Sequence, residues 1–176
     1  GGTSAYSSGT DTASVVVTAV NDAPVVTVSG GAASWSEGNN VASNPVAVDS
    51  ALTLSDADGP NPLSASARML TYYSSQDTLS FVNAGLTMGN IVGTWTVGTG
   101  TLTLTSAGNQ ATVAQFEAAL RSITYNNSSN SPNTTTRTVQ FIVTDGSSAA
   151  STAVTRHITI PAVNNSPTIS AVPSLP

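Results

Sequence analysis

The sequence predicts an all-β protein, an antiparallel sandwich of Greek-key type with one short helix. Short runs in which every second residue is apolar recur along the chain, separated by Asn, Gly, Ser and Asp. Only 7% of the 176 residues are charged and none is lysine, so the polar surface must come from Thr, Ser, Asn and Gly. That composition suits half-exposed strands and turns, and a hydrophobic content of 39% is enough to build a core.

A heptad occurs twice, as "VNDAPVV" at 20–26 and "VNNSPTI" at 163–169, and similar segments precede both copies. The spacing from Asn21 to Asn164 is 164 − 21 = 143 residues, and a fixed spacing indicates tandem units. We therefore interpret the chain as a piece of a longer protein. Its parts are the last strand of a preceding unit with a linker (1–23), one complete unit (24–163), and a linker with the start of the next unit (164–176).

The alternating runs predict the strands of the complete unit. In chain order they lie at 46–54, 68–73, 77–82, 90–97, 100–105, 122–127, 137–144 and 152–160. In the seventh run Val139, Phe141 and Val143 share the face that we expect to point inward. In the last run Arg156 shares the inward face, whereas His157 lies on the outer face.

One segment has helical spacing instead. In "TVAQFEAALRS", which begins at Thr112, the apolar residues Val113, Phe116 and Leu120 share one helical face. Thr112 and Gln115 have the spacing of a capping box. We predict one short helix near 112–121, packed across the sandwich.

Composition also argues against several classes of function. The formal net charge is −5 without a basic cluster, which argues against nucleic acid and anionic membranes as partners. No run approaches the roughly 18 apolar residues of a membrane span, so we expect no membrane insertion. The absence of cysteine excludes disulfides and thiolate chemistry. With a single histidine on an outer face and no lysine, we expect no enzyme.

Carboxylates follow two of the predicted strands. Asp56 and Asp58 lie in "DADG" directly after one strand, and Asp145 lies in "TDG" directly after another. If both strands run the same way, these side chains meet at the pole where the chain enters through Asn21 and Asp22. Converging oxygen ligands suit Ca²⁺, which takes about 6–8 of them. Asp-Gly is also an ordinary turn signal without a metal, but carboxylates with no lysine nearby would repel one another, so we predict a calcium site.

Five aromatic residues offer an alternative function. Trp35, Trp95, Tyr72, Tyr73 and Tyr125 would make a carbohydrate-binding platform if they were exposed together. Aromatic residues of a sandwich belong more often to the core. We predict that Trp95 is a core residue, because it shares a strand face with other apolar residues, and that Trp35 is partly exposed near a pole.

The motifs of the unit resemble those of a known family. "VNDAP", "SEG" at Glu37, "LSDADG" and "VTDG" occur in the order of the cadherin calcium motifs. The unit as a whole resembles the cadherin-like tandem repeats of very large bacterial surface adhesins. The stretches "LRSITYNNSS" and "RTVQFIVTDG" are also similar to repeats of chondroitin-sulfate proteoglycans. The resemblance implies a cadherin-like or immunoglobulin-like sandwich.

The resemblance also implies calcium ligands and a function. The residues that would face calcium are Asn21, Asp22, Asp56, Asp58 and Asp145 at one pole and Glu37 at the other. Both junctions depart from the family pattern, because Ala19 and Ala162 stand where the first linker acid is expected. The second junction also has Asn165 in place of the next acid. The implied function is a calcium-stiffened structural or adhesion repeat of a secreted or cell-surface protein. Its expected partners are the neighbouring repeats and, through the parent adhesin, glycans or proteins of a cell surface.

Overall fold

The computed structural model describes residues 2, 9, 11–39, 41, 43–59 and 61–169. One α-helix, α1 (Val113–Arg121), and two single-turn 3₁₀ helices accompany the strands. The strands are β1 (Val25–Thr27), β2 (Ala32–Ser34), β3 (Val46–Ala47), β4 (Thr53–Ser55), β5 (Pro62–Met69), β6 (Asp77–Ser80), β7 (Ile91–Thr96), β8 (Thr101–Ser106), β9 (Thr124–Asn127), β10 (Arg137–Asp145) and β11 (Val154–Thr159).

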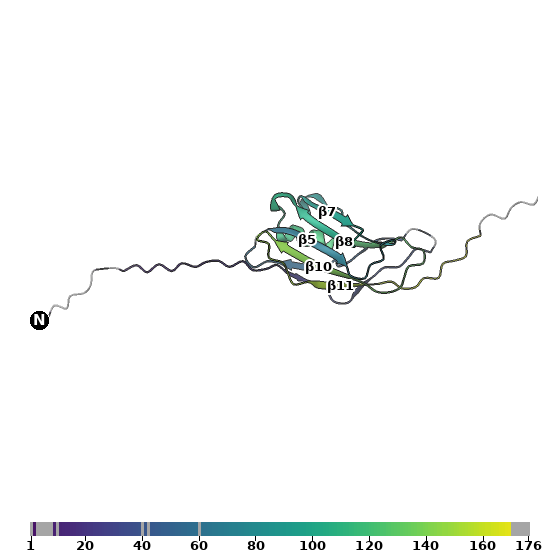
Figure 1. The fold of residues 1–176 in the computed structure, drawn as a ribbon, viewed down its shortest axis with the longest axis horizontal. Coiled ribbons are helices and arrows are strands. Elements are labelled where there is room, and N and C mark those ends of the chain that lie inside the picture. Colours follow the sequence, from purple (N-terminus) through teal and green to yellow (C-terminus); the bar gives the residue numbers. More distant parts are fainter. Residues whose placement is uncertain are drawn as a thin grey trace, which may run out of the picture.

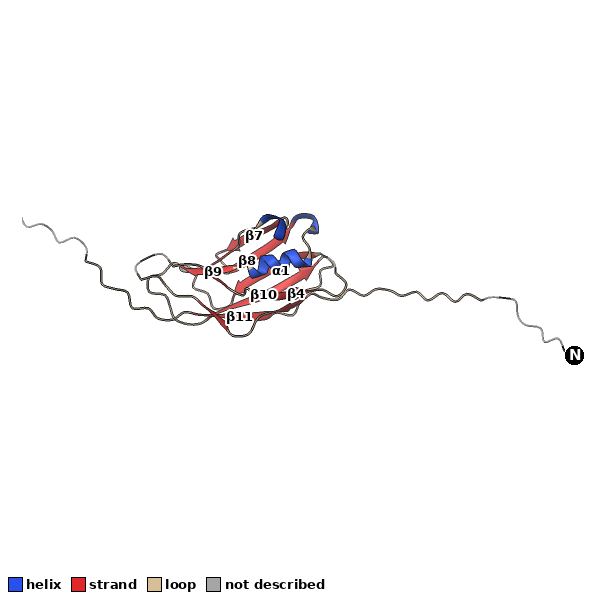
Figure 2. Ribbon diagram, turned by 180° about the vertical axis from the view of Figure 1, so that it is seen from behind, coloured by secondary structure: helices blue, strands red, loops and turns tan. Residues whose placement is uncertain are grey.

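The strands form a two-layered sandwich (Figure 1). One layer is a six-stranded sheet in the order β2-β11-β10-β5-β8-β7. The second layer consists of the sheet β3-β9-β6, the pair β1-β4 and α1, which lies against β4 and β5 (Figure 2). The strand pairs are antiparallel except β11 with β2, which is parallel. The prediction of an all-β sandwich with one short helix is confirmed, with this parallel pair as an addition.

Period-two alternation decides how β10 and β11 pack. Val139, Phe141 and Val143 of β10 are fully buried, as predicted, while the residues between them are half-buried on the outer face. Arg156 of β11 lies inward and His157 lies exposed on the outer face, also as predicted. Strand β10 is one of the two central strands of the larger sheet and β11 lies beside it, and the apolar faces of both meet the second layer.

Helix α1 begins where the capping-box spacing predicts. The Gln115 backbone N–H donates to Thr112 Oγ1 at 3.3 Å, and the Thr112 N–H donates to Gln115 Oε1 at 2.9 Å. These two bonds satisfy backbone donors that the first helical turn leaves unpaired. Phe116 and Leu120 are fully buried, and Val113 packs against the core as a partly buried residue.

The predicted strand at 68–73 is misplaced, because β5 spans 62–69 and the chain leaves the sheet afterwards. The inward positions of β5 include Ala65 and Ala67, which are buried but give a weak apolar signal in the sequence. Leu70, by contrast, is half-exposed. The short strands β1 and β2 are further elements that the alternating runs do not predict.

Both tryptophan predictions need correction. Trp35 is fully buried rather than partly exposed; it packs edge-to-face on Tyr125 with ring centres 5.9 Å apart. Its indole N–H donates to Asn126 Oδ1 at 3.1 Å, which satisfies the buried donor. Trp95 is half-buried rather than a full core residue, because β7 is the outermost strand of its sheet; it packs edge-to-face on Tyr72 with centres 5.8 Å apart.

The chain enters and leaves the sandwich at opposite ends (Figures 1 and 2). We call the end where residues 20–24, 56–59 and 145–149 lie the N-terminal pole. The other end, where residues 37–39, 130 and 165–166 meet, is the C-terminal pole. This arrangement agrees with units that follow one another in a line. Within the described residues, no helix has the length and apolar character that a membrane crossing requires.

Candidate metal centre

Two strands deliver acidic loops to the N-terminal pole. Strand β1 starts from the linker at this pole and pairs antiparallel with β4, so β4 runs back towards it and places Asp56 and Asp58 there. Strand β10 also ends at this pole, with Asp145 as its last residue. The condition for convergence, that both strands run in the same direction, is therefore met.

Hydrogen bonds tie the linker to both loops. Asn21 Nδ2 donates to Asp145 Oδ2 at 2.7 Å, and the Asp22 backbone N–H donates to Asp58 Oδ2 at 2.8 Å. In the "DADG" turn, the backbone N–H after Asp58 donates to Asp56 Oδ1 at 3.3 Å. The structure thus brings these five residues together at one pole.

Asp145 is the most firmly held of the carboxylates. Its side chain is fully buried, and its Oδ1 accepts backbone N–H bonds from Ser147 at 2.9 Å and Ala149 at 2.8 Å. The amide of Asn21, assisted by these backbone donors, holds the pKa of Asp145 below its usual value. Asp145 therefore stays ionised and links the linker to the end of β10.

The pKa values of Asp56 and Asp58 are shifted in opposite directions. The Asp22 N–H holds the pKa of Asp58 below its usual value, although the negative charge of Asp145 opposes the shift. Burial and the neighbouring carboxyl of Asp58 raise the pKa of Asp56. Asp56 Oδ2 is buried without a hydrogen-bond partner. An ionised Asp58 has no proton to donate to it, so the Asp56 carboxylate lacks a positive or donating neighbour on that side.

No basic side chain among the described residues neutralises this pole. The ion pairs of the described residues join Arg121 to Glu117, Arg137 to Asp77 and Arg156 to Asp49. None of them involves a carboxylate of the N-terminal pole. Such a group is destabilising unless a cation compensates it.

The chemistry of the donor set fits a hard cation. Carboxylate and amide oxygens are the ligands that Ca²⁺ prefers, and the unpartnered Asp56 Oδ2 offers one of them. As they stand, however, no three His, Cys, Asp or Glu side chains of the described ranges are grouped closely enough to hold a metal ion. The calcium site therefore stays a prediction, and binding would require these side chains to draw closer together.

Glu37 lies at the C-terminal pole and does not join the other candidate ligands. Its carboxylate is buried and accepts from Asn165 Nδ2 at 3.4 Å. The same amide nitrogen donates to the Asn130 carbonyl at 2.9 Å, while Asn165 Oδ1 is buried without a partner. The linker acid Asp22 of the first heptad is thus replaced at the second by an amide that hydrogen-bonds Glu37.

A buried ion pair near the C-terminal end of the sandwich was missed by the sequence analysis. Arg137 Nε donates to Asp77 Oδ2 at 2.9 Å, and both side chains are fully buried. Asp77 Oδ1 also accepts from the Tyr125 hydroxyl and from Asn127 Nδ2, each at 2.7 Å. Burial and the Asp77 carboxylate raise the pKa of Tyr125. The alternation of β10, extended backwards from Val139, was the available signal that Arg137 points inward.

A second buried arginine closes the loop between β1 and β2. Arg156 Nη1 donates to the carbonyls of Ser29, Gly30 and Gly31 at 2.6–2.8 Å. Asp49, 3.8 Å from Arg156 Nε, accepts from the Ser29 N–H and hydroxyl, each at 2.7 Å. Burial opposes the lowering of the Asp49 pKa, but these Ser29 hydrogen bonds and the arginine charge outweigh it. The two buried arginines, Arg137 and Arg156, thus have a structural role.

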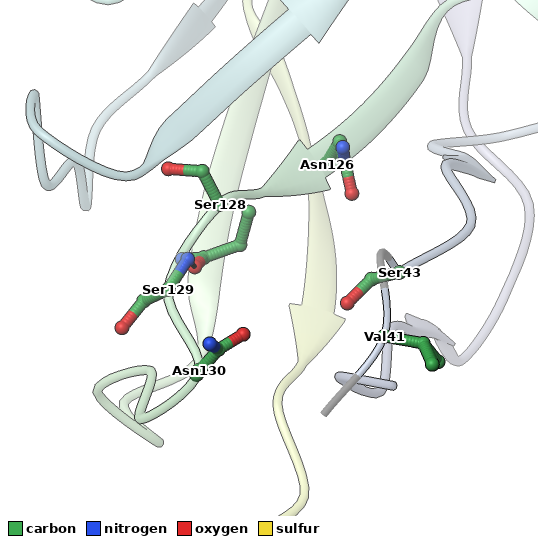
Figure 3. A pocket seen from close by; sticks show the side chains of 7 residues that line it. Val41, Ser43, Asn126, Ser128, Ser129 and Asn130 are labelled. Carbon is green, nitrogen blue, oxygen red and sulfur yellow. Dashed lines mark hydrogen bonds between the residues drawn. The ribbon is translucent and has the colours of Figure 1, made fainter. Parts of the chain in front are cut away.

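A polar cavity of about 240 Å³ lies beside the end of β9 (Figure 3). Its lining residues are Val41, Ser43, Asn126, Asn127, Ser128, Ser129 and Asn130. None of these side chains is ionisable, so the cavity offers hydroxyl and amide groups but no acid, base or carboxylate ligand. It is separate from the acidic residues of the N-terminal pole.

The five aromatic residues do not form one exposed platform. Trp35 and Tyr125 are fully buried, and Trp95, Tyr72 and Tyr73 are half-buried. Comparison of the sequence with protein-family models and with curated proteins gave no match.

Proposed function

We propose that this chain contains one calcium-stiffened structural repeat of a long extracellular or cell-surface protein, with the neighbouring repeats as its immediate partners. The observation that carries the proposal is the acidic pole: Asp56, Asp58 and Asp145 meet the linker there without a basic partner among the described residues. The entry and exit of the chain at opposite ends support a linear array (Figure 1).

Calcium would act on the linker. The ligands would be the side chains of Asn21, Asp56, Asp58 and Asp145, with Asp22 turned towards the preceding unit. A bound cation would supply the positive charge that this pole lacks and would hold the linker against two loops at once. Restricting the linker in this way would stiffen the joint between units, which is the mechanical property that a spacer needs.

Thermal unfolding with and without calcium tests the proposal. A ligand that binds only the folded state stabilises it by about 2.7 kcal/mol at a hundredfold excess over its Kd. We expect calcium to raise the Tm, a chelator to reverse the rise, and magnesium to substitute poorly because it prefers near-octahedral geometry. Asp58→Asn should lose the rise, because it removes a ligand charge and keeps the side-chain shape.

Glu37→Gln is the matched control, since it removes one carboxylate at the other pole. This variant should keep the full calcium-induced rise in Tm. Equal melting temperatures of the wild type and Asp58→Asn in calcium and in chelator would reject the metal site and leave "DADG" as a turn.

The carbohydrate-binding alternative has less support, because its aromatic residues are buried or paired with one another. Retention of the chain on a polysaccharide column separates the two functions. Retention that persists in chelator would favour carbohydrate binding over the structural repeat.

A further inference from the structure

Strand β7 is the longest open edge of the sandwich. It ends the six-stranded sheet and has six residues, whereas the other edge strands are shorter: β1, β2 and β4 have three residues each, β3 has two and β6 has four. In Figure 1 it lies at the margin of the molecule. Its pairing with β8 runs from Ile91 to Thr96 without a bulge. Soluble proteins usually protect such edges with charges, proline or bulges, and β7 has none of these.

The surroundings of β7 are uncharged. No Asp, Glu, Lys, Arg or His occurs from residue 78 to residue 116, a stretch that includes β7 and β8. Exposed apolar side chains accompany the edge: Val82 is 80% exposed, Leu86 97% and Val92 61%. Because the whole chain has a formal charge of −5, two copies meet with least repulsion at this neutral edge.

Backbone direction identifies which groups of the edge are open. The carbonyl of Ile91 accepts from Asn83 Nδ2 at 2.8 Å, and its N–H donates to the Met88 carbonyl at 3.4 Å, so Ile91 faces away from β8. Along an antiparallel strand both backbone groups of a residue point to the same side, and the side alternates. Gly93 and Trp95 therefore also face away from β8, where no further strand of the described chain lies.

We propose that two copies of this chain pair laterally through β7, antiparallel and with Thr94 opposite Thr94. This register joins Gly93 of each copy to Trp95 of the other by two hydrogen bonds. It leaves the Ile91 groups with their present partners and places Val92 beside Thr96. The pairing is isologous, so the two six-stranded sheets become one continuous sheet and the association closes as a dimer. Because the paired strands run in opposite directions, the contact suits repeats of two oppositely directed chains, and it does not depend on the linker pole.

Single cysteines test this register, because the chain has none of its own. Thr94→Cys places two thiols in a non-hydrogen-bonded pair with Cα atoms about 4.5 Å apart, within the range of a disulfide. Thr103→Cys, directly beside Thr94 on β8, lies one strand further in on each copy, so its Cα atoms are about 14 Å apart at the usual strand spacing. Thr155→Cys on β11 is a control for an exposed thiol distant from β7.

We expect Thr94→Cys to form disulfide-linked dimers about tenfold faster than either control under mild oxidation, because pairing raises the effective thiol concentration. We also expect the wild type to self-associate with rising concentration in sedimentation. Thr94→Glu, which places two like charges directly opposite each other at the centre of the pairing and leaves the backbone bonds to β8 intact, should stay monomeric. Far-UV circular dichroism checks that Thr94→Glu is folded. Equal crosslinking rates at 94, 103 and 155, or a wild-type chain that stays monomeric at all concentrations, would overturn the proposal.

Discussion

The two ends of the sandwich treat their carboxylates differently. Towards the C-terminal pole, Asp77 is buried and neutralised by Arg137, with Tyr125 and Asn127 satisfying its remaining oxygen. At the N-terminal pole, Asp56, Asp58 and Asp145 meet the linker without an arginine. The buried Asp77 thus has its cation in the same chain, whereas we propose that the carboxylates at the entry of the chain take theirs from solution.

The largest effect should come from removing the internal cation. Arg137→Met leaves Asp77 buried without its charge partner, which should lower the free energy of unfolding by about 3–5 kcal/mol. Urea unfolding in calcium and in chelator should give the same loss, because this pair lies apart from the N-terminal pole.

The double variant Arg137→Met with Asp77→Asn is the control for this prediction. It removes both charges, so it should be more stable than Arg137→Met alone. A loss that depended on calcium would contradict the separation of the two poles.

The second prediction concerns Asp56, the uncompensated carboxylate of the N-terminal pole. Asp56→Asn should lose most of the calcium-induced stabilisation, which for the wild type is about 2.7 kcal/mol at a hundredfold excess over Kd. In chelator the same variant should be slightly more stable than the wild type, on the order of 0.5 kcal/mol, because it removes the repulsion between the half-buried Asp56 and the exposed Asp58. Thermal melts of both proteins in calcium and in chelator measure the loss and the gain. A variant less stable than the wild type in chelator would show that Asp56 Oδ2 has a donor in the calcium-free protein.

Much of this fold follows from residue patterns, because burial on one face of a strand imposes a period of two. The alternation in β10 and the capping box of α1 each specify their element locally, and both are found where predicted. Strand β5 was misplaced because Ala65 and Ala67, its buried side chains, are small and carry little hydrophobic signal. Trp35 was misjudged because its partner Tyr125 lies distant in sequence, so no local pattern reports their contact.

The acidic pole was predictable for a related reason. Each of these carboxylates, Asp56, Asp58 and Asp145, lies at or after the end of a strand. Strands that run in one direction end at one pole, so the convergence depends on strand direction more than on side-chain packing. The pair of Arg137 and Asp77 was harder to foresee. Arg137 begins β10 of the six-stranded sheet and Asp77 begins β6 of the three-stranded sheet, so the two residues meet only through the packing of the layers. Whether the pole holds calcium stays a prediction.

The third prediction uses pH to separate the carboxylates of the N-terminal pole. The pKa of Asp56 is raised above 3.8, so in chelator its contribution to stability is present below that value and is lost as pH rises through the raised pKa. The pKa values of Asp58 and Asp145 are lowered, so their contributions are present above 3.8 and are lost only as pH falls below it. At the proposed site, calcium would compete with the proton for Asp56.

The calcium-induced rise in Tm should therefore shrink between neutral pH and about pH 4, before Asp58 and Asp145 titrate. Thermal melts in calcium and in chelator across this range measure the difference. The Glu37→Gln variant should follow the wild-type profile, since its change lies at the other pole. A calcium effect of constant size down to pH 4 would show that Asp56 is not a ligand.

The smallest expected effect comes from giving the C-terminal pole the acid that its heptad lacks. Asn165 donates to Glu37 and to the Asn130 carbonyl, so Asn165→Asp replaces a donor with a second carboxylate. In chelator this should cost about 1 kcal/mol, because Glu37 loses its hydrogen bond and gains a like charge. If the missing acid is what distinguishes the poles, calcium should now restore that loss, while it leaves the C-terminal pole of the wild type unaffected. The measurement is the calcium-dependent change in Tm of Asn165→Asp in an Asp58→Asn background, in which the N-terminal pole should no longer respond to calcium. A chain that stays insensitive to calcium there would show that the two poles differ by more than this one residue, and that the carboxylates brought together by β4 and β10 have no counterpart beside Glu37.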